Sequence, residues 1–365
     1  MRVDGAGPGP EPWENLGVDD PVDELIAAEA PHSARHIWVL GRPRLIPAAR
    51  PWAPTSFWSD DIRELGPVRH NHGDEIIANP MDGDAGPVPD QVWMELPESL
   101  DALDNTLSAL HGLAAARGAT NLHIVAGGRI RRMNKSLNTV AARWFDDVHA
   151  SLGRRRARVL HFSSPRVHPA RGAGWPRHNQ ISTMGLKVEL VAHGGVFHGA
   201  GLDAGTALLL DQRGTMLSRL PSRPAILDLG CGNGVIAAAL ALELQGAAEV
   251  QARDVSWLAV DSTRRTALAN HVDVDVTQAD GLDGVADESL DLIVTNPPFH
   301  RGSARDSAPT RRMLTDAARV LRPGGQLWCV YNSHLPWGEH LDAEVGPTQQ
   351  VARTKAYTVT RTIRD

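Results

Sequence analysis

A short glycine-rich motif constrains the fold of this chain more than any other feature. An apolar segment, PAILDLG, leads into the sequence Asp228-Leu-Gly230-Cys-Gly232-Asn233-Gly234. The apolar run predicts a buried strand that ends in an acid and turns at glycines, whose missing side chains let the backbone approach a ligand. The third glycine comes one residue too early for GxGxxG, the fingerprint of dinucleotide-binding turns. The motif therefore predicts an α/β sheet with a ligand at the carboxyl end of this strand.

Strand and helix patterns alternate through both halves of the 365-residue chain, as is typical of doubly wound α/β folds. The strands expected in the first half are 36–40, 91–96, 121–128 and 157–162, and the helices are 99–117 and 134–151. The strands expected in the second half are 186–192, 224–230, 257–261, 274–280, 289–299, 326–332 and a pair within 348–363, and the helices are 202–213, 233–244, 262–270 and 310–321. A Pro- and Gly-rich linker at 166–178 separates the halves. We predict an acidic, loose leader over 1–34, one α/β domain over 35–180 and a second over 181–365.

Acidic residues end the two strands that are expected after the glycine motif. Asp261 ends the strand 257–261, and Asp280, followed by Gly281, ends the strand 274–280. The carboxyl ends of parallel strands lie at one edge of a sheet, so these acids are expected beside the glycine turn. Carboxylates accept hydrogen bonds from ribose hydroxyls, which we assign to Asp261, and from an adenine amino group, which we assign to Asp280. Asp254 is an alternative for the ribose role.

The strand expected at 289–299 ends in Asn296-Pro297-Pro298-Phe299-His300. The two prolines end the strand and hold the turn rigid, so that the Asn296 side chain and the Pro297 carbonyl present two acceptors. Two acceptors suit an exocyclic amino group, whose protons they hold so that the nitrogen lone pair points at an electrophile. Phe299 would stack on a planar base that has left its helix, and His300 would contact the base or a phosphate. This turn predicts a site that reacts at an amino nitrogen.

The composition excludes several classes of protein. No window holds the ~20 apolar residues of a membrane helix, and the N-terminus is polar and acidic rather than a secretory signal. The two cysteines, Cys231 and Cys329, are too few for a disulfide framework or a cysteine-rich zinc site, which favours a reducing cytoplasm. His70 and His72, near Asp74 and Glu75, lack the helical spacing of a zinc protease, so we expect no metal.

The net charge of −6 conceals a basic block in the middle of the chain. Between residues 129 and 177 twelve basic residues accompany two acidic ones. Local positive charge of this kind is typical of contact with a polyanion, although a solvated surface in an arginine-rich chain has the same pattern. The candidates for contact with RNA phosphates are Arg129, Arg131, Arg132, Lys135, Arg154, Arg155 and Arg156, together with His300.

The glycine motif, the strand-end acids and the NPPFH turn together resemble class I S-adenosylmethionine-dependent methyltransferases of the methyltransferase small domain family. The segment GGVFHGAGLDAGTALLL, residues 194–210, is similar to the one that precedes the cofactor strand in that family. Within this family, the chain resembles tandem-domain enzymes that methylate the N2 of guanine in ribosomal RNA. It resembles the large-subunit type more than the small-subunit type. The resemblance of 125–145 to the large-subunit type implies a degenerate N-terminal methyltransferase domain that recognises RNA.

The resemblance also implies roles for single residues. The cofactor would contact Asp228, Gly230, Gly232, Asn233, Gly234, Asp261, Asp280, Gly281, Asn296 and Thr206, and the target base would contact Asn296, Pro297, Pro298 and Phe299. The expected enzyme is a cytoplasmic monomer that transfers a methyl group from S-adenosylmethionine to a guanine of ribosomal RNA. The alternatives are a methyltransferase for another amino group, in protein, DNA or a small molecule, and a non-catalytic RNA-binding factor.

Overall fold

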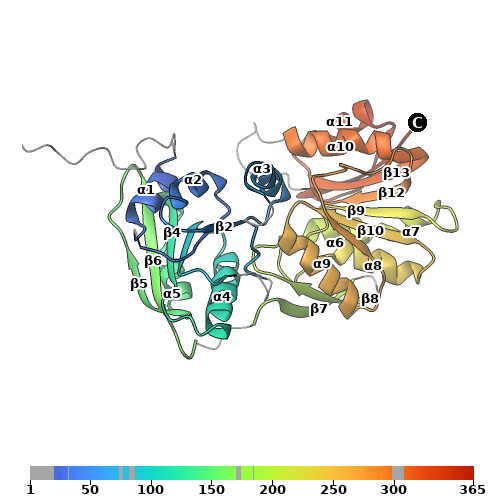
Figure 1. Cartoon of the computed structure of the whole chain (residues 1–365). Helices are drawn as coiled ribbons and strands as arrows, with labels where there is room; N and C mark the ends of the chain where they lie inside the picture. The colour runs from blue at the N-terminus through green and yellow to red at the C-terminus, as the bar shows by residue number, and fades with distance from the viewer. Residues whose placement is uncertain are drawn as a thin grey trace, which may run out of the picture. The chain divides into compact units, whose positions relative to one another are not determined.

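The computed structural model describes residues 20–31, 33–73, 77–81, 87–169, 174–183, 185–297 and 308–365. The chain divides into two compact units, Met1–Gly174 and Trp175–Asp365 (Figure 1). Each unit is built around its own mixed sheet with helices on both faces, which confirms the tandem α/β architecture expected from the alternating patterns. The hairpin partner of residues 177–183 lies in the second unit, so the division comes slightly before residue 180.

The second unit contains a seven-stranded sheet of order β11-β10-β9-β12-β13-β15-β14. The first five strands are parallel, and β15 runs antiparallel to both β13 and β14. The strands of the whole second unit are β7 (Arg177–Thr183), β8 (Leu186–Ala192), β9 (Ala225–Leu229), β10 (Glu249–Asp254), β11 (Asp275–Gln278), β12 (Leu290–Thr295), β13 (Leu321–Asn332), β14 (Thr348–Arg353) and β15 (Tyr357–Ile363). Its helices are α6 (Ala204–Leu210), α7 (Arg213–Leu217), α8 (Val235–Leu244), α9 (Trp257–Ala269), α10 (Ala308–Val320) and α11 (Trp337–Glu344).

Helices cover both faces of this sheet (Figure 1). Helices α6 and α8 pack on one face around the buried Trp328, and helices α10 and α11 pack on the other around Leu327 and Leu341. The strands β7 and β8 form a separate hairpin, and Thr266 of α9 donates to and accepts from the backbone of Val191 in β8. Because both faces are covered, a ligand can reach the sheet only at its edges, where the strands end.

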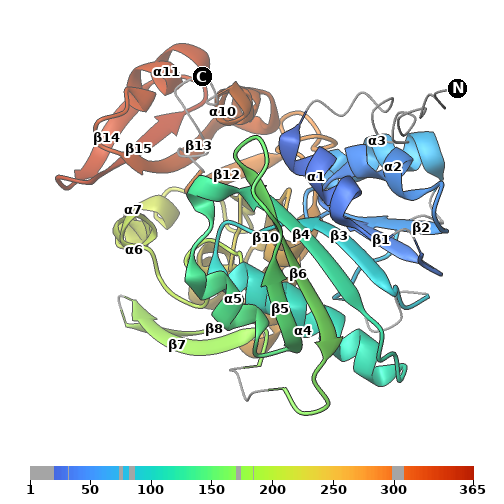
Figure 2. The ribbon, with the colours of Figure 1, turned by 90° about the vertical axis from the view of Figure 1, so that its left-hand side faces the viewer.

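The first unit contains a six-stranded sheet of order β2-β1-β3-β4-β6-β5 (Figure 2). Its strands are β1 (Ile37–Leu40), β2 (Thr55–Trp58), β3 (Gln91–Glu95), β4 (His123–Arg129), β5 (Phe145–Ala150) and β6 (Ala157–Pro165). Its helices are α1 (Pro21–Glu29), α2 (Ile46–Ala49), α3 (Ile62–His72), α4 (Leu100–Ala116) and α5 (Lys135–Ala141), with 3₁₀ turns at Pro43–Leu45 and Ile130–Arg132. Helix α1 lies so close to β4 that a Cβ on Gly127 would come 2.6 Å from Ile26 Cγ1.

Three expectations about local structure are wrong. Residues 21–29 form α1 rather than loose chain, because Val22 and Ile26 bury their side chains on the sheet; residues 1–19 lie outside the described part. The helix expected over 134–151 ends at Ala141, and Phe145–Ala150 pairs with β6 as a strand. The strand expected at 257–261 is the first part of α9, whose N-terminus is capped by Ser256. A four-residue apolar run does not distinguish a strand from a helix, and here the cap decides.

Within the described ranges, no helix has the length and apolar character needed to cross a membrane. The same ranges contain no group of three or more His, Cys, Asp or Glu side chains that could hold a metal ion.

Candidate active site

The glycine turn after β9 leaves open space next to the backbone. The backbone N–H groups of Gly230 and Cys231 both donate to the carbonyl of Arg253, at 2.8 and 3.0 Å. Gly230 and Gly232 have φ of +76° and +54°, and a Cβ on either would meet no atom within 4 Å. Gly234 has a different task, because its Cβ would lie 2.8 Å from Thr263 Cα of α9. Two glycines therefore admit a ligand, and the third allows two helices to pack.

Asp228, the last polar residue of β9, is completely buried. Its Oδ2 accepts a hydrogen bond from the N–H of Ala237 at 3.0 Å, whereas its Oδ1 has no partner. Burial raises the pKa of this carboxyl to about 7. A buried carboxylate oxygen without a partner is rare and costly. This atom therefore indicates a ligand that brings a hydrogen-bond donor or a positive charge.

The first strand after the glycine turn is β10, and the acid at its end is Asp254 and not Asp261. Asp254 ends β10, and its two oxygens accept from the backbone N–H groups of Gly232 at 3.1 Å and Ser256 at 3.0 Å. Asp261 lies inside α9, where it pairs with His193 at 2.7 Å and with Arg265. Burial raises the pKa of Asp261, but the hydrogen bonds from these two residues outweigh it and leave the pKa below its usual value. The expectation that Asp261 ends a strand is therefore wrong, and Asp254 takes that place.

Asp280 and Gly281 follow β11, the neighbour of β10 at the edge of the sheet. Asp280 is half-buried. Gly281 has a φ of +55°, at which a residue with a side chain would be strained. The carboxyl ends of β9, β10 and β11 thus carry Asp228, Asp254 and Asp280 along one edge of the sheet. This is the edge at which doubly wound sheets bind ligands.

Asn296 follows β12 and is fixed by residues at the start of α6. Its Nδ2 donates to Asp203 Oδ2 at 3.1 Å and to Thr206 Oγ1 at 2.8 Å. Thr295, one residue earlier, donates from its hydroxyl to the carbonyl of Leu229 at 2.6 Å, which ties the end of β12 to the end of β9. Pro297 is buried, and Pro298, Phe299 and His300 lie outside the described residues. Asn296 is therefore beside the glycine turn, as its place in the sequence predicts.

Asn233 has a structural task within the glycine motif. Its Nδ2 donates to the carbonyls of Gly199 and Gly201, both at 2.8 Å, and its Oδ1 accepts from the N–H of Val235 at 3.2 Å. These bonds fasten the loop before α6 to the start of α8. Cys231, between the glycines, is buried, and burial raises the pKa of its thiol, so it is not poised as a nucleophile.

The basic candidates of the first unit separate into paired and unpaired residues. Arg129 pairs with Asp20 at 3.1 Å, Arg132 with Glu98 at 2.5 Å and Arg155 with Glu24 at 2.6 Å. Four others are exposed and form no ion pair with any described residue, and we call them the unpaired basic group: Arg131, Lys135, Arg154 and Arg156.

The hairpin between β5 and β6 carries two members of this group. Arg154 and Ala157 exchange backbone hydrogen bonds of 2.9 and 2.8 Å around Arg155 and Arg156, which have φ of +49° and +63°. Such two-residue turns ordinarily use Asn and Gly, because a left-handed backbone costs other residues ~1–2 kcal/mol each. The N–H of Ile130 donates to the carbonyl of Arg156 at 3.0 Å, which brings Arg131 beside the hairpin. The tip therefore displays concentrated positive charge.

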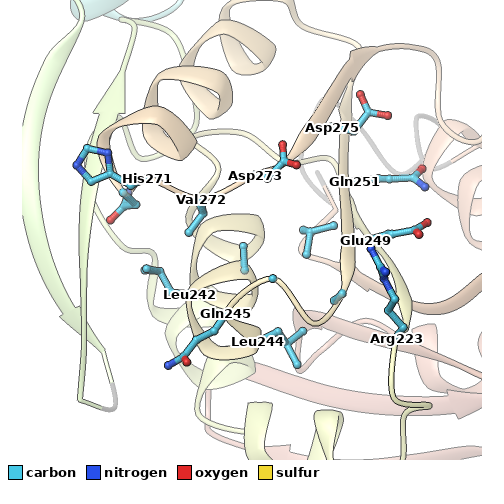
Figure 3. A pocket seen from close by; sticks show the side chains of 15 residues that line it. Arg223, Leu242, Leu244, Gln245, Glu249, Gln251, His271, Val272, Asp273 and Asp275 are labelled. Carbon is cyan, nitrogen blue, oxygen red and sulfur yellow. The ribbon is translucent and has the colours of Figure 1, made fainter.

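A cavity of about 710 Å³ lies at a different place in the second unit (Figure 3). It is lined by Arg223, which precedes β9, by Glu249 at the start of β10 and by Asp275 at the start of β11. These residues are at the amino ends of the strands. The cavity is thus at the edge opposite to Asp228, Asp254 and Asn296, and it contains none of them.

Two contacts of the site could not be expected from the sequence. The hydroxyl of Tyr357, in β15, donates to Asp203 Oδ1 at 3.5 Å, although the two residues are 154 positions apart. Asp203 itself is recognisable as the residue before a helix, where it caps α6 through the N–H of Thr206. Its contact with Asn296, 93 positions later, has no local signal.

The chain is similar to known proteins over both units. Residues 187–361 match the methyltransferase small domain family, and residues 70–166 match the RLMG N-terminal domain family. The ribosomal RNA large subunit methyltransferase G of Streptomyces coelicolor is 34% identical over 76% of this chain and 74% of its own length. The ribosomal RNA small subunit methyltransferase C of Hahella chejuensis is 32% identical over 75% of this chain and 78% of its own length.

Among solved structures, the fold is similar to that of a T. thermophilus 16S rRNA N2 methyltransferase in complex with AdoMet and guanosine. The TM-score is 0.78 at 22% identity, and the match covers 96% of this chain and 93% of the other. The open glycine turn, the unpartnered Asp228 oxygen and the two matching families agree with one another. The chain therefore belongs to the family of the ribosomal RNA large subunit methyltransferase G proteins and is an S-adenosylmethionine-dependent methyltransferase.

Proposed function

We propose that this enzyme methylates the exocyclic N2 amino group of a guanine in ribosomal RNA, as a monomer in the cytoplasm. The observation that carries the proposal is the fixed amide of Asn296, whose two hydrogen bonds to Asp203 and Thr206 employ its nitrogen and leave its carbonyl oxygen as the acceptor for a substrate. The names of the relatives, which are ribosomal RNA methyltransferases, support the choice of RNA.

The residues at the carboxyl edge of the second sheet fit S-adenosylmethionine. The unpartnered Oδ1 of Asp228 suits a cationic ligand, and the space beside Gly230 and Gly232 admits one. Asp254 would accept from ribose hydroxyls and Asp280 from the adenine amino group. When bound, S-adenosylmethionine supplies a methyl group made electrophilic by its sulfonium.

Asn296 and Pro297 have to prepare a poor nucleophile. The lone pair of the guanine amino nitrogen is delocalised into the ring, so the nitrogen attacks only when it is held out of that conjugation. The carbonyls of Asn296 and Pro297 accept the two amino protons and favour a tetrahedral nitrogen. The amino group needs no general base before attack, because its proton can leave to water afterwards, so positioning supplies most of the acceleration.

The first unit is proposed to hold the RNA. The unpaired basic group would contact phosphates, and Phe299 would stack on the extruded guanine with His300 nearby. Arg129, Arg132 and Arg155 are engaged with acids of the same unit and would contribute less.

Mass mapping of modified nucleotides tests the proposal in ribosomal RNA from cells with and without this gene. We expect one N2-methylguanosine to disappear with the gene, and to return with the wild type but not with Asn296→Ala. The variant should lower methyl transfer by ~100-fold or more, the loss usually seen when one fixed polar group of an active site is removed. Calorimetry should show nearly unchanged affinity of Asn296→Ala for S-adenosylmethionine. An unchanged ribosomal RNA profile would contradict the proposal and direct the search to protein, DNA or small-molecule acceptors.

A further inference from the structure

Behind Asn296 lies a cluster of side chains centred on Asp203, which we call the Asp203 cluster: Asp203, Thr206, Asn296 and Tyr357. Asp203 is 8% exposed, and it is the residue that caps α6. The cluster joins the loop before α6, the end of β12 and the start of β15. It lies on the side of Asn296 occupied by the amide nitrogen.

An ionised carboxylate can only accept hydrogen bonds, so Asp203 sets the direction of the bonds around it. Its Oδ2 accepts from the N–H of Thr206 at 3.0 Å and from Asn296 Nδ2 at 3.1 Å. The Thr206 hydroxyl, 3.5 Å from the same oxygen, donates its single proton to the carboxylate. That hydroxyl therefore faces Asn296 with a lone pair, and the 2.8 Å contact between them requires an N–H of the amide.

The same contacts determine which end of the Asn296 amide faces the substrate. Both acceptors, Asp203 Oδ2 and Thr206 Oγ1, are met by Nδ2. If the amide were turned over, its carbonyl oxygen would face a carboxylate and a hydroxyl whose proton is already used, and both contacts would become repulsive. The observed orientation is thus the one that the hydrogen-bond directions permit, and the opposite end of the amide is a carbonyl.

We propose that Asp203 and Thr206 are positioning residues that hold the Asn296 amide with its carbonyl toward the substrate, and so make the site selective for an amino group. This inference rests on the proposed function in that the substrate offers N–H protons. A hydroxyl or ring carbonyl at the same place would find a pair of acceptors, with at most one proton to give them, and would be rejected.

The second oxygen of Asp203 is held from another direction, which keeps the carboxylate from rotating. The Tyr357 hydroxyl donates to Oδ1 at 3.5 Å, and His198 Nε2 lies 3.8 Å from the same atom. The charge of Asp203 raises the pKa of Tyr357, as expected for a phenol beside an anion. Gly205 makes room for this arrangement, because its Cβ would come 2.9 Å from the Tyr357 ring.

Three variants test the proposal by steady-state kinetics. Asp203→Asn introduces an amide that can also donate, so the orientation of Asn296 is no longer enforced, and kcat should fall by ~100-fold. Thr206→Val removes one hydrogen bond at constant shape and should lower kcat by ~10-fold. Thr206→Ser restores the hydroxyl and should recover most of that loss. All three should keep their thermal midpoint within a few degrees, and Asp203→Asn should keep its affinity for S-adenosylmethionine.

A second measurement reports on the amide without any RNA. In ¹⁵N-labelled protein the side-chain NH₂ signals of Asn296 can be assigned by their absence from Asn296→Asp. We expect these signals to shift in Asp203→Asn and Thr206→Val and to stay near the wild-type position in Thr206→Ser. Unmoved signals, or an unchanged kcat in Asp203→Asn, would overturn the positioning role. A wild-type enzyme that fails to methylate ribosomal RNA while the signals shift would contradict the proposed function and leave the positioning role supported.

Discussion

The two sheets of this molecule repeat one topology, and the comparison shows which side chains distinguish the two otherwise similar sheet edges. In the first unit β2, β1, β3, β4, β6 and β5 have the order and directions of β10, β9, β12, β13, β15 and β14 in the second. A bridge from Phe57 to Ile77 marks the place of β11. The first turn also repeats, since the N–H of Gly41 donates to the carbonyl of Trp58 at 2.8 Å, as Gly230 does to Arg253.

The strand registers align the two sites residue by residue. Asp228 corresponds to the buried Val39, and Asn296 corresponds to Glu95. Asp254 corresponds to Ser59. The Ser59 hydroxyl accepts from the N–H of Asp61 at 3.1 Å, as Asp254 accepts from the N–H two residues after it. The first unit thus repeats the backbone of this sheet edge with other side chains.

Arg42 stands where the second unit has Cys231, just after the first glycine of the turn. Its guanidinium lies 2.6 Å from Asp23, 3.0 Å from Glu95 and 3.2 Å from Asp20. Burial disfavours the charge, but these acids outweigh it and raise the pKa of Arg42 above its usual value. At this sheet edge the first unit therefore places a cation of its own, whereas the second unit presents the carboxyl of Asp228, whose Oδ1 has no partner.

The largest effect is expected on the pH dependence of the free energy of unfolding, and it comes from Asp228 in the second unit. Its pKa is about 7 when folded against an ordinary 3.8, so between these values the folded state keeps a proton that the unfolded state has lost. This contribution to the free energy of unfolding is fully present below pH ~4 and is lost as the pH rises through ~7, a change of ~4 kcal/mol. Urea unfolding of the cofactor-free protein across this range should show the decline, and Asp228→Asn should lack it. Equal pH dependence in both proteins would contradict the assignment.

The next largest effect is expected on the free energy of unfolding when Arg42 of the first unit is replaced. Replacing it in Arg42→Met leaves the buried Asp23 without its cation, so the free energy of unfolding should fall by about 3 kcal/mol. Affinity for S-adenosylmethionine should not change, because Arg42 belongs to the first unit, whereas we propose that the cofactor binds to the second. Chemical unfolding and calorimetry measure the two quantities, with the exposed Arg131→Met as the control. A similar loss in the control would show that the ion pairs of Arg42 are not the cause.

A matched pair of glycine substitutions sharpens the comparison at the turn itself. Gly41 and Gly230 have φ of +65° and +76°, and neither Cβ would meet an atom within 4 Å. Gly41→Ala and Gly230→Ala should therefore cost the same ~1–2 kcal/mol of backbone strain. Only Gly230→Ala should also weaken S-adenosylmethionine binding, which isothermal titration can measure. Equal cofactor affinity in both variants would place the ligand away from this turn.

The smallest effect is expected on RNA affinity. Arg154→Ala and Arg156→Ala should each reduce the slope of log affinity against log salt by ~0.7, the value for one contact with single-stranded phosphate. Arg155→Ala is the control, since Arg155 already pairs with Glu24 at 2.6 Å. Filter binding at several salt concentrations gives the slopes. A control that loses as much slope as the other two would remove the distinction between paired and unpaired arginines.

Most of the site was predictable because it depends on residues that are neighbours in the chain. The glycine turn, the proline-bounded end of β12 and the cap of α6 by Asp203 each arise within a few positions. The expectation for Asp261 is wrong because a short apolar run has no periodicity of its own, and the cap at Ser256 begins a helix there instead of a strand. The acid that does end the strand is Asp254, the alternative for the ribose role in the sequence.

What the sequence determined by itself was therefore local: where strands turn, where helices begin, and which residue types stand at the ends of strands. Tertiary structure decided which of those residues meet. The carboxylate of Asp203 reaches Asn296 and Tyr357 only because β12, β13 and β15 are neighbours in the sheet of the second unit. Arg42 meets Asp23 only because α1 packs on the sheet of the first unit. Hydrogen bonds and ion pairs act over about 3 Å in space whatever their separation in the chain, so their partners are set by the fold as a whole.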